Sequence, residues 1–231
     1  MKDLQLLYLI DRAQRLKHKL EIIGDLKSGK EATVYRVMLD GDLVAMKVYE
    51  DPEKRAFQNT GKYLAGKTYK KESERRAVAK GNRFAKKMQQ DNWIKREFSI
   101  LNKLYKLGAK IPKPILQIEN AVFMELLGDM EIAAPRLCNV ELSVDQAQKA
   151  YKQIMENILI FWSVGIIHAD LSEYNILWWN NEAYIIDFPQ CIDLRTNPNY
   201  KEILEKDIQN IVRFFSKYFK IDFNEVMSGF V

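Results

Sequence analysis

The stretch H-A-D-L-S-E-Y-N occupies residues 168–175, and I-I-D-F follows at residues 185–188. Together they place an acid at Asp170, an amide five positions later at Asn175, and a second acid at Asp187 after a short apolar run. Carboxylate and amide oxygens are ligands that Mg²⁺ takes together with phosphate and water. The spacing therefore predicts a phosphoryl-transfer site. Asp170 would orient or deprotonate an attacking hydroxyl or water, and Asn175 and Asp187 would hold the metal.

Protein kinases carry the same spacing as H-R-D-x-x-x-x-N followed by D-F-G. In this chain Ala169 replaces the arginine and Pro189 replaces the glycine. We expect His168 to brace the loop by hydrogen bonding. The competing interpretation, that the two acids and the amide are ordinary turn and strand-end residues, accounts for none of the chain's other motifs.

A lysine inside an apolar run is the second informative feature. Lys47 lies within V-A-M-K-V-Y, residues 44–49, a pattern typical of a strand. An unpaired ammonium group is costly to bury, so this lysine should have an anionic partner. In phosphoryl-transfer enzymes the partners are nucleotide phosphate and a helix glutamate, for which Glu97 is the candidate. The alternative is an edge-strand lysine that points to water.

The residues S-G-K-E-A-T-V-Y, 28–35, include a turn between two β-like runs. Backbone N–H groups of a tight turn can cradle phosphate, and Ser28 and Lys30 would add a hydroxyl group and a charge. The turn meets neither the G-x-G-x-x-G nor the Walker A pattern. An ordinary β-hairpin turn is therefore an equal alternative.

Composition limits the class of protein. The chain has 231 residues and 47% apolar content, which suits one large domain or two small lobes. No apolar run reaches about 18 residues, so we expect no membrane span. The charged start does not resemble a secretory signal. Cys138 and Cys191 lack metal-site spacing, so we expect both to be reduced and buried in a cytoplasmic protein.

Positive charge is concentrated in one segment. Residues 54–96 hold 14 lysines and arginines but only three acids, so this segment carries +11 within a chain of net charge +5. Such a concentration predicts an anionic partner at one place rather than a generally basic protein. A solvated helical face is the alternative.

The hydrophobic pattern predicts an α+β chain with a β-rich first part and a helical second part. We expect a lobe of residues 1–127 that includes a basic insertion at 51–91, and a helical lobe of residues 128–231. The expected helices cover residues 3–20, 92–107, 143–162 and 200–219. The expected strands cover residues 22–26, 33–39, 43–48, 115–118, 121–126, 176–178 and 184–186. In the first helix the packed stripe would be Leu4, Leu7, Leu16 and Leu20.

Three motifs together resemble the RIO family of atypical protein kinases over nearly the whole chain. They are S-G-K-E-A-T-V-Y (28–35), H-A-D-L-S-E-Y-N (168–175) and I-D-F-P-Q (186–190). The L-S-E-Y-N wording resembles the type 1 branch, whereas D-F-P-Q is closer to type 2. Type 2 members carry an N-terminal winged-helix domain, and only about 20 residues precede the first expected strand. We therefore expect a compact type 1 protein of archaeal style.

The resemblance implies a two-lobed protein-kinase-like fold that uses ATP and Mg²⁺, with Mn²⁺ as a substitute. Ser28 and Lys30 would lie in the phosphate loop, and Lys47 would contact phosphate while paired with Glu97. The carbonyl of Glu125 and the N–H of Leu127 would bind adenine. Asp170 would be the catalytic acid, and Asn175 and Asp187 would hold the metal.

The family also implies a destination for the phosphate. Asp187 can itself accept phosphate, which gives an ATPase-like cycle. Residues 51–70 match a flexible loop that is autophosphorylated, with Thr68 and Ser73 as acceptors here. RIO proteins act in maturation of the small ribosomal subunit, so the expected partner is pre-ribosomal RNA bound through residues 54–96.

Ordinary protein kinases dock a peptide with an activation segment that ends in A-P-E and with several further helices, and neither A-P-E nor room for those helices follows Asp187. We therefore expect a protein that hydrolyses ATP and phosphorylates itself but is a poor kinase for peptides in trans. Two alternatives stay open. One is a small-molecule phosphotransferase of the aminoglycoside or choline kinase type, which shares H-x-D-x-x-x-x-N. The other is a ribosome-assembly scaffold whose binding is switched by nucleotide.

Overall fold

A computed structural model describes residues 2–29, 31–50 and 83–230, with the side chains of helix α4 described from Asp91 onward. The expectations for Lys30, for the loop at 51–70 and for Thr68 and Ser73 lie outside the described residues.

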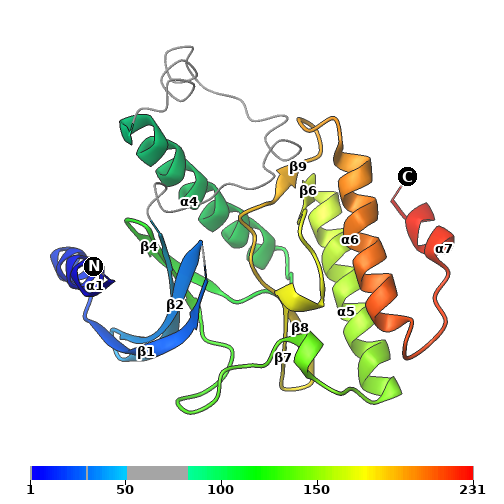
Figure 1. Cartoon of the computed structure of the whole chain (residues 1–231), viewed down its shortest axis with the longest axis horizontal. Helices are drawn as coiled ribbons and strands as arrows, with labels where there is room; N and C mark the ends of the chain where they lie inside the picture. The colour runs from blue at the N-terminus through cyan, green and yellow to red at the C-terminus, as the bar shows by residue number, and fades with distance from the viewer. Residues whose placement is uncertain (1, 30, 51–82, 231) are drawn as a thin grey trace. The chain divides into compact units, whose positions relative to one another are not determined.

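The helices are α1 Lys2–Arg15, α4 Arg83–Lys106, α5 Val144–Ser163, α6 Tyr200–Phe215 and α7 Phe223–Ser228 (Figure 1). The strands are β1 Leu20–Ser28, β2 Ala32–Leu39, β3 Asp42–Tyr49, β4 Pro114–Ile118, β5 Ala121–Glu125, β6 Ile166–Ile167, β7 Ile176–Trp179, β8 Glu182–Ile185 and β9 Ile192–Asp193.

The chain divides into two compact units. The first unit contains the described parts of residues 1–50, 83–102 and 112–133, and the second contains residues 103–111 and 134–230. The sequence predicts a single cut after residue 127. In the structure, residues 128–133 lie with the first unit and residues 103–111 with the second.

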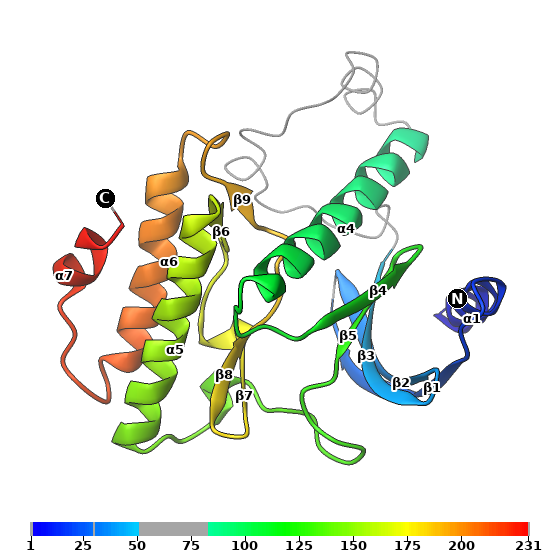
Figure 2. The same ribbon diagram turned by 180° about the vertical axis from the view of Figure 1, so that it is seen from behind.

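The first unit is built on an antiparallel five-stranded sheet in the order β1-β2-β3-β5-β4 (Figure 2). Burial alternates along β2, because successive side chains of a strand point to opposite faces. The β2–β3 hairpin pairs Leu39 with Asp42 and turns at Asp40 and Gly41, whose φ values are 55° and 97°. Two positive φ values define a type I′ turn, which suits Asp-Gly.

Helix α1 packs with a different face from the one predicted. Leu9 and Ala13 are buried, whereas Leu4 and Leu7 are 70% and 62% exposed. The buried residues belong to an apolar stripe of spacing i, i+3, i+4, i+7 that begins at Leu6, while the predicted stripe is interrupted by Asp11. The helix also ends at Arg15, five residues earlier than predicted. There the N–H of His18 reaches the carbonyl of Ala13 across Lys17, which has a φ of 68°.

Helix α4 covers the predicted helix at 92–107 and begins nine residues earlier. Ile94, Leu101 and Leu104 are buried, and Tyr105 is exposed near the helix end. Glu97 is also buried, which is unusual for a carboxylate unless it has donors. Its donors are part of the candidate site.

The second unit packs α5 beside α6, with α7 on the other side of α6 (Figures 1 and 2). Helix α5 begins with a capping box, in which Ser143 and Gln146 each bond the other's backbone N–H. Two short ladders, β6–β9 and β7–β8, complete the unit. Cys191 is buried as predicted, but Cys138 is only half-buried, and both are reduced. No helix in the described ranges is both long and apolar enough to cross a membrane.

Candidate active site

The two acids and the amide of the sequence motif lie in the second unit. The Asn175 side-chain Nδ2 donates to the carbonyl oxygen of Asp170 at 2.8 Å and to its carboxylate Oδ2 at 3.1 Å. The N–H of Ile186 donates to the carbonyl of Asn175 at 2.9 Å. Nε2 of His168 hydrogen-bonds the carbonyl of Ile186 at 3.1 Å, so His168 braces the loop as expected. These contacts join the loop at 168–175 to the backbone that leads into Asp187.

Two residues of the site have left-handed backbone. The φ values are 69° at Ala169 and 72° at Asp187. An aspartate visits this region more readily than an alanine, for which it costs roughly 1–2 kcal/mol. The conformation of Ala169 therefore needs support from its surroundings.

That support comes from helix α6, for which the sequence predicts a helix and no role in the site. Asp207 accepts hydrogen bonds from the N–H groups of Ala169 at 2.7 Å and Leu171 at 2.9 Å, and is 3% exposed. The Asn210 side chain donates to the carbonyl of Leu171 at 3.0 Å. The signal that could have identified Asp207 is its position as an acid within the apolar stripe of α6.

The electrostatics of the site follow from partial burial and crowded carboxylates. Although Asp170 is exposed as a residue, partial burial of its carboxyl raises its pKa, and the neighbouring charge of Asp187 raises it further. The hydrogen bond from Asn175 and the charge of Lys206 act in the opposite direction. Burial raises the pKa of Asp207 to about 7, against the two backbone hydrogen bonds that favour its charged form.

The oxygen atoms of this cluster fit a magnesium ion. Because Nδ2 of Asn175 is held by Asp170, its Oδ1 is left as an acceptor that no described residue engages. Asp187 is exposed. Mg²⁺ is typically bound by one or two carboxylates plus water and substrate phosphate, and it would also relieve the repulsion between Asp170 and Asp187. The described residues hold no cluster of three or more His, Cys, Asp or Glu that would suit a dedicated metal cage.

In the first unit, the expected ion pair of Lys47 and Glu97 is present. Nζ of Lys47 lies 3.2 Å from Oε1 of Glu97, and both side chains are largely buried. Strand β3 is central in the sheet, so the alternative of an edge-strand lysine is wrong. The hydroxyl of Tyr49 donates to Oε2 of Glu97, a contact that the sequence analysis missed.

The other expected nucleotide contacts also lie in the first unit. Ser28 is exposed at the end of β1, where the Gly29 N–H bonds the Ala32 carbonyl and closes the turn. Glu125 ends β5, and its side chain accepts from the Lys113 N–H at 3.1 Å. Leu127 is buried, yet its N–H makes no hydrogen bond to any described residue.

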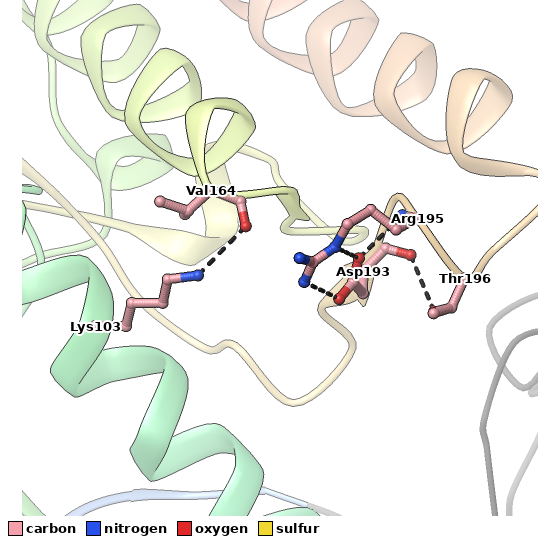
Figure 3. Close-up of polar contacts among 5 residues, drawn as sticks. All are labelled: Lys103, Val164, Asp193, Arg195 and Thr196. Carbon is pink, nitrogen blue, oxygen red and sulfur yellow. Dashed lines mark hydrogen bonds and ion pairs between the residues drawn. The ribbon is translucent and has the colours of Figure 1, made fainter.

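The segment after Asp187 is short and held in place before α6 begins at Tyr200. Its strand β9 pairs with β6, and the Leu194 N–H bonds the Gly165 carbonyl. Figure 3 shows the Arg195 guanidinium on the Asp193 carboxylate, with N–O distances of 2.8 and 2.6 Å. It also shows the Lys103 amino group against the Val164 carbonyl at the end of α5, where a cation is favoured. The chain therefore returns directly from Asp187 to α6.

We predict that Asp207 makes stability depend on pH. In the unfolded chain its carboxyl ionises near 3.8, and in the folded protein near 7. Between these values the folded state holds a proton that the unfolded state has lost. The free energy of unfolding therefore falls as the pH rises, by up to about 1.4 kcal/mol per pH unit, and levels off above the folded pKa. Urea unfolding of wild type and Asp207→Asn across this range measures the difference between their slopes.

In that experiment the free energy of unfolding of Asp207→Asn should depend less steeply on pH than that of wild type. Asp145→Asn is the matched control, because Asp145 is an exposed aspartate on α5. It should keep the wild-type slope. Equal slopes in wild type and Asp207→Asn would contradict the pKa assigned to Asp207.

The chain is similar to proteins of a known family. A family model described as "RIO domain" matches residues 33–226. The RIO-type serine/threonine-protein kinase Rio1 of Haloferax volcanii is 31% identical over 195 residues, which are 84% of this chain and 63% of that protein. Human serine/threonine-protein kinase RIO1 is 32% identical over 200 residues, covering 86% of this chain and 34% of that protein. The chain thus spans less than two thirds of the length of these relatives.

A solved structure shares the fold. The Rio2 kinase–ADP/Mg²⁺–phosphoaspartate complex from Chaetomium thermophilum aligns with a TM-score of 0.64 and 21% identity, over 95% of this chain and 64% of that one. This likeness confirms the α+β, kinase-like fold predicted from the sequence. With the family match over most of its length and the Rio1 relatives, the chain belongs to the RIO domain family.

Proposed function

We propose that this protein is an ATP-dependent serine/threonine kinase and ATPase that phosphorylates itself and acts in maturation of the small ribosomal subunit. The observation that carries the proposal is the contact of Asn175 with Asp170, next to the backbone that leads into Asp187. This arrangement offers oxygen atoms for a metal beside a carboxylate of raised pKa. The names of the relatives, which are serine/threonine kinases, support transfer to hydroxyl groups.

Each unit supplies a distinct part of the proposed chemistry. In the first unit, Lys47 binds phosphate oxygens of ATP with Glu97 as its fixed counter-ion, and Ser28 and Lys30 add contacts from the turn. The unpaired N–H of Leu127 supports the proposal that Leu127 N–H and the Glu125 carbonyl bind adenine.

The second unit supplies the metal ligands and the reacting groups. Oδ1 of Asn175 and the Asp187 carboxylate hold Mg²⁺ or Mn²⁺, which neutralises charge on the phosphates when bound. Asp170 accepts the proton of the attacking hydroxyl or water, a role for which a carboxyl of raised pKa is suited. We place the reaction in the cytoplasm, where reduced Cys138 and Cys191 are stable.

We propose Asp187 as one destination of the phosphate. Its carboxylate oxygen would attack the γ-phosphorus, forming an acyl phosphate while ADP leaves. Water would then attack the acyl phosphate and lose its proton to Asp170, which gives ADP and inorganic phosphate overall. The Rio2 structure is named as a phosphoaspartate complex with ADP and Mg²⁺, which supports this route for a member of the family.

Labelling with γ-³²P-ATP tests the route. We expect label on the wild-type protein in two pools, one released by neutral hydroxylamine, as acyl phosphates are, and one resistant, as phosphoserine and phosphothreonine are. Asp187→Asn should lack the sensitive pool, because an amide cannot form the acyl phosphate. Asp170→Asn should slow turnover of that pool, because the water loses its proton acceptor.

Asp145→Asn again serves as the matched control, since it makes the same acid-to-amide change at an exposed site on α5. It should keep both pools. A hydroxylamine-sensitive pool that persists in Asp187→Asn would reject Asp187 as the acceptor. An unlabelled wild-type protein that also releases no phosphate would reject the proposed function.

We further propose that pre-ribosomal RNA binds the basic segment at 54–96 and the helix that continues it. Helix α4 carries four exposed cations at helical spacing, Lys95, Arg96, Lys103 and Lys106. Its acid Glu97 is turned inward to Lys47. Among the described residues, Lys95, Arg96 and Lys106 form no ion pair, so their charges are available to phosphate groups. Binding of this kind depends steeply on salt, because each phosphate contact releases a counterion.

Replacing these four cations with alanine should weaken binding of a small-subunit RNA fragment and reduce the salt slope of log K by up to about 3 units. ATP turnover should change little. The matched control replaces four exposed lysines outside α4 with alanine, namely Lys113, Lys149, Lys201 and Lys220. Filter binding between 50 and 200 mM salt is the measurement. Equal salt slopes for the two variants would show that net charge, not the α4 face, decides binding.

A further inference from the structure

We propose that Tyr49 is a positioning residue of the nucleotide site, whose hydroxyl holds the Glu97 carboxylate in place for Lys47 before any nucleotide binds. The inference rests on the proposed function, because it assigns Lys47 to the phosphates of ATP. It gives a role to Tyr49, to which the sequence patterns assign none.

The two carboxylate oxygens of Glu97 have separate donors from one strand. Lys47 lies 3.2 Å from Oε1, and the Tyr49 hydroxyl donates to Oε2. Lys47 and Tyr49 are two residues apart in β3, so their side chains leave the same face of the sheet. A single strand therefore presents both groups to one carboxylate on α4.

The Tyr49 ring is itself enclosed. Tyr49 is fully buried, and the edge of Trp93 from α4 meets its ring at 5.1 Å with an interplanar angle of 72°. The ammonium of Lys47 lies 5.0 Å from the centre of the same ring, a cation–π contact. The ring thus contacts both Lys47 and α4, while its hydroxyl holds Glu97.

The backbone of Tyr49 is anchored from two directions. Its carbonyl accepts the Asn120 side chain at 2.5 Å and the Gln5 side chain of α1 at 3.3 Å. Its N–H donates to the Asn120 carbonyl at 3.0 Å. These contacts come from the turn between β4 and β5 and from α1, and they fix the backbone from which the Tyr49 side chain extends.

Tyr49 also stays a donor over the working pH range. Burial raises the pKa of its phenol well above the ordinary value, and the charge of Glu97 raises it further. In protein kinases the equivalent Lys–Glu pair must be put in place, and its formation is a point of control. Here the phenol holds the carboxylate, so the pair is ready without that step.

The kinetic test is the variant Tyr49→Phe, which removes only the hydroxyl. We expect kcat for ATP hydrolysis to fall tenfold or more, while KM for ATP changes less than threefold. The adenine contacts and the charge of Lys47 remain, but the lysine is no longer aligned. The matched control is Tyr35→Phe, another buried tyrosine of the same sheet, on β2, which contacts neither Lys47 nor Glu97. Its kcat should stay within twofold of wild type.

A double-mutant cycle separates positioning from general stabilisation. If Tyr49 acts through Glu97, then Tyr49→Phe should cause no further loss of kcat in a Glu97→Gln background. A purely structural role for the hydroxyl would give multiplicative losses. Wild-type turnover in Tyr49→Phe, or multiplicative losses in the cycle, would overturn the inference.

Amide hydrogen exchange without nucleotide tests the same contact independently of activity. Residues 91–102 of α4 should exchange faster in Tyr49→Phe than in wild type or Tyr35→Phe, since α4 loses a tie to β3. Unchanged exchange would overturn the inference even if the protein is an active kinase. Absence of ATP hydrolysis in wild type would instead reject the proposed function, and the exchange data alone would then decide the role of Tyr49.

Discussion

The side chain of Asn175 binds both the backbone and the carboxylate of Asp170, and the geometry of the second unit depends on that contact. It fixes the direction of the amide, so that the nitrogen faces Asp170 and the oxygen has no partner among the described residues. The Asn175 carbonyl and the His168 ring both bind Ile186, the residue before Asp187. The Asn175 amide and the His168 imidazole thus tie the loop that carries Asp170 to the backbone that leads into Asp187.

In both units a buried polar side chain holds a neighbouring residue of the candidate site in position. Buried Asp207 holds the left-handed backbone of Ala169, next to Asp170. Buried Tyr49 and Glu97 hold Lys47. Burial makes the loss of any of these partners costly, because a donor or acceptor would be left unsatisfied in an apolar surrounding. Lys47 and the backbone beside Asp170 are therefore both held by buried side chains.

Local signals predicted much of this structure. Ser143 starts its helix because its side chain and that of Gln146 satisfy exposed N–H groups, and this chemistry is visible in the sequence. The partner of Lys47 was predicted correctly because a buried ammonium requires an acid. The prediction of the packed face of α1 was wrong, because that helix has two apolar stripes and tertiary contacts decide which of them is buried. Tyr49 and Asp207 were missed because their roles arise from partners 48 and 36–38 residues away.

The central claim is that Asn175 and Asp187 hold a divalent cation for a bound nucleotide. Electron paramagnetic resonance of Mn²⁺, titrated in the presence of a non-hydrolysable ATP analogue, tests it most directly. Wild type should bind Mn²⁺ with one tight site, and both Asp187→Ala and Asn175→Leu should bind it at least tenfold more weakly. Unchanged Mn²⁺ affinity in either variant would contradict the account.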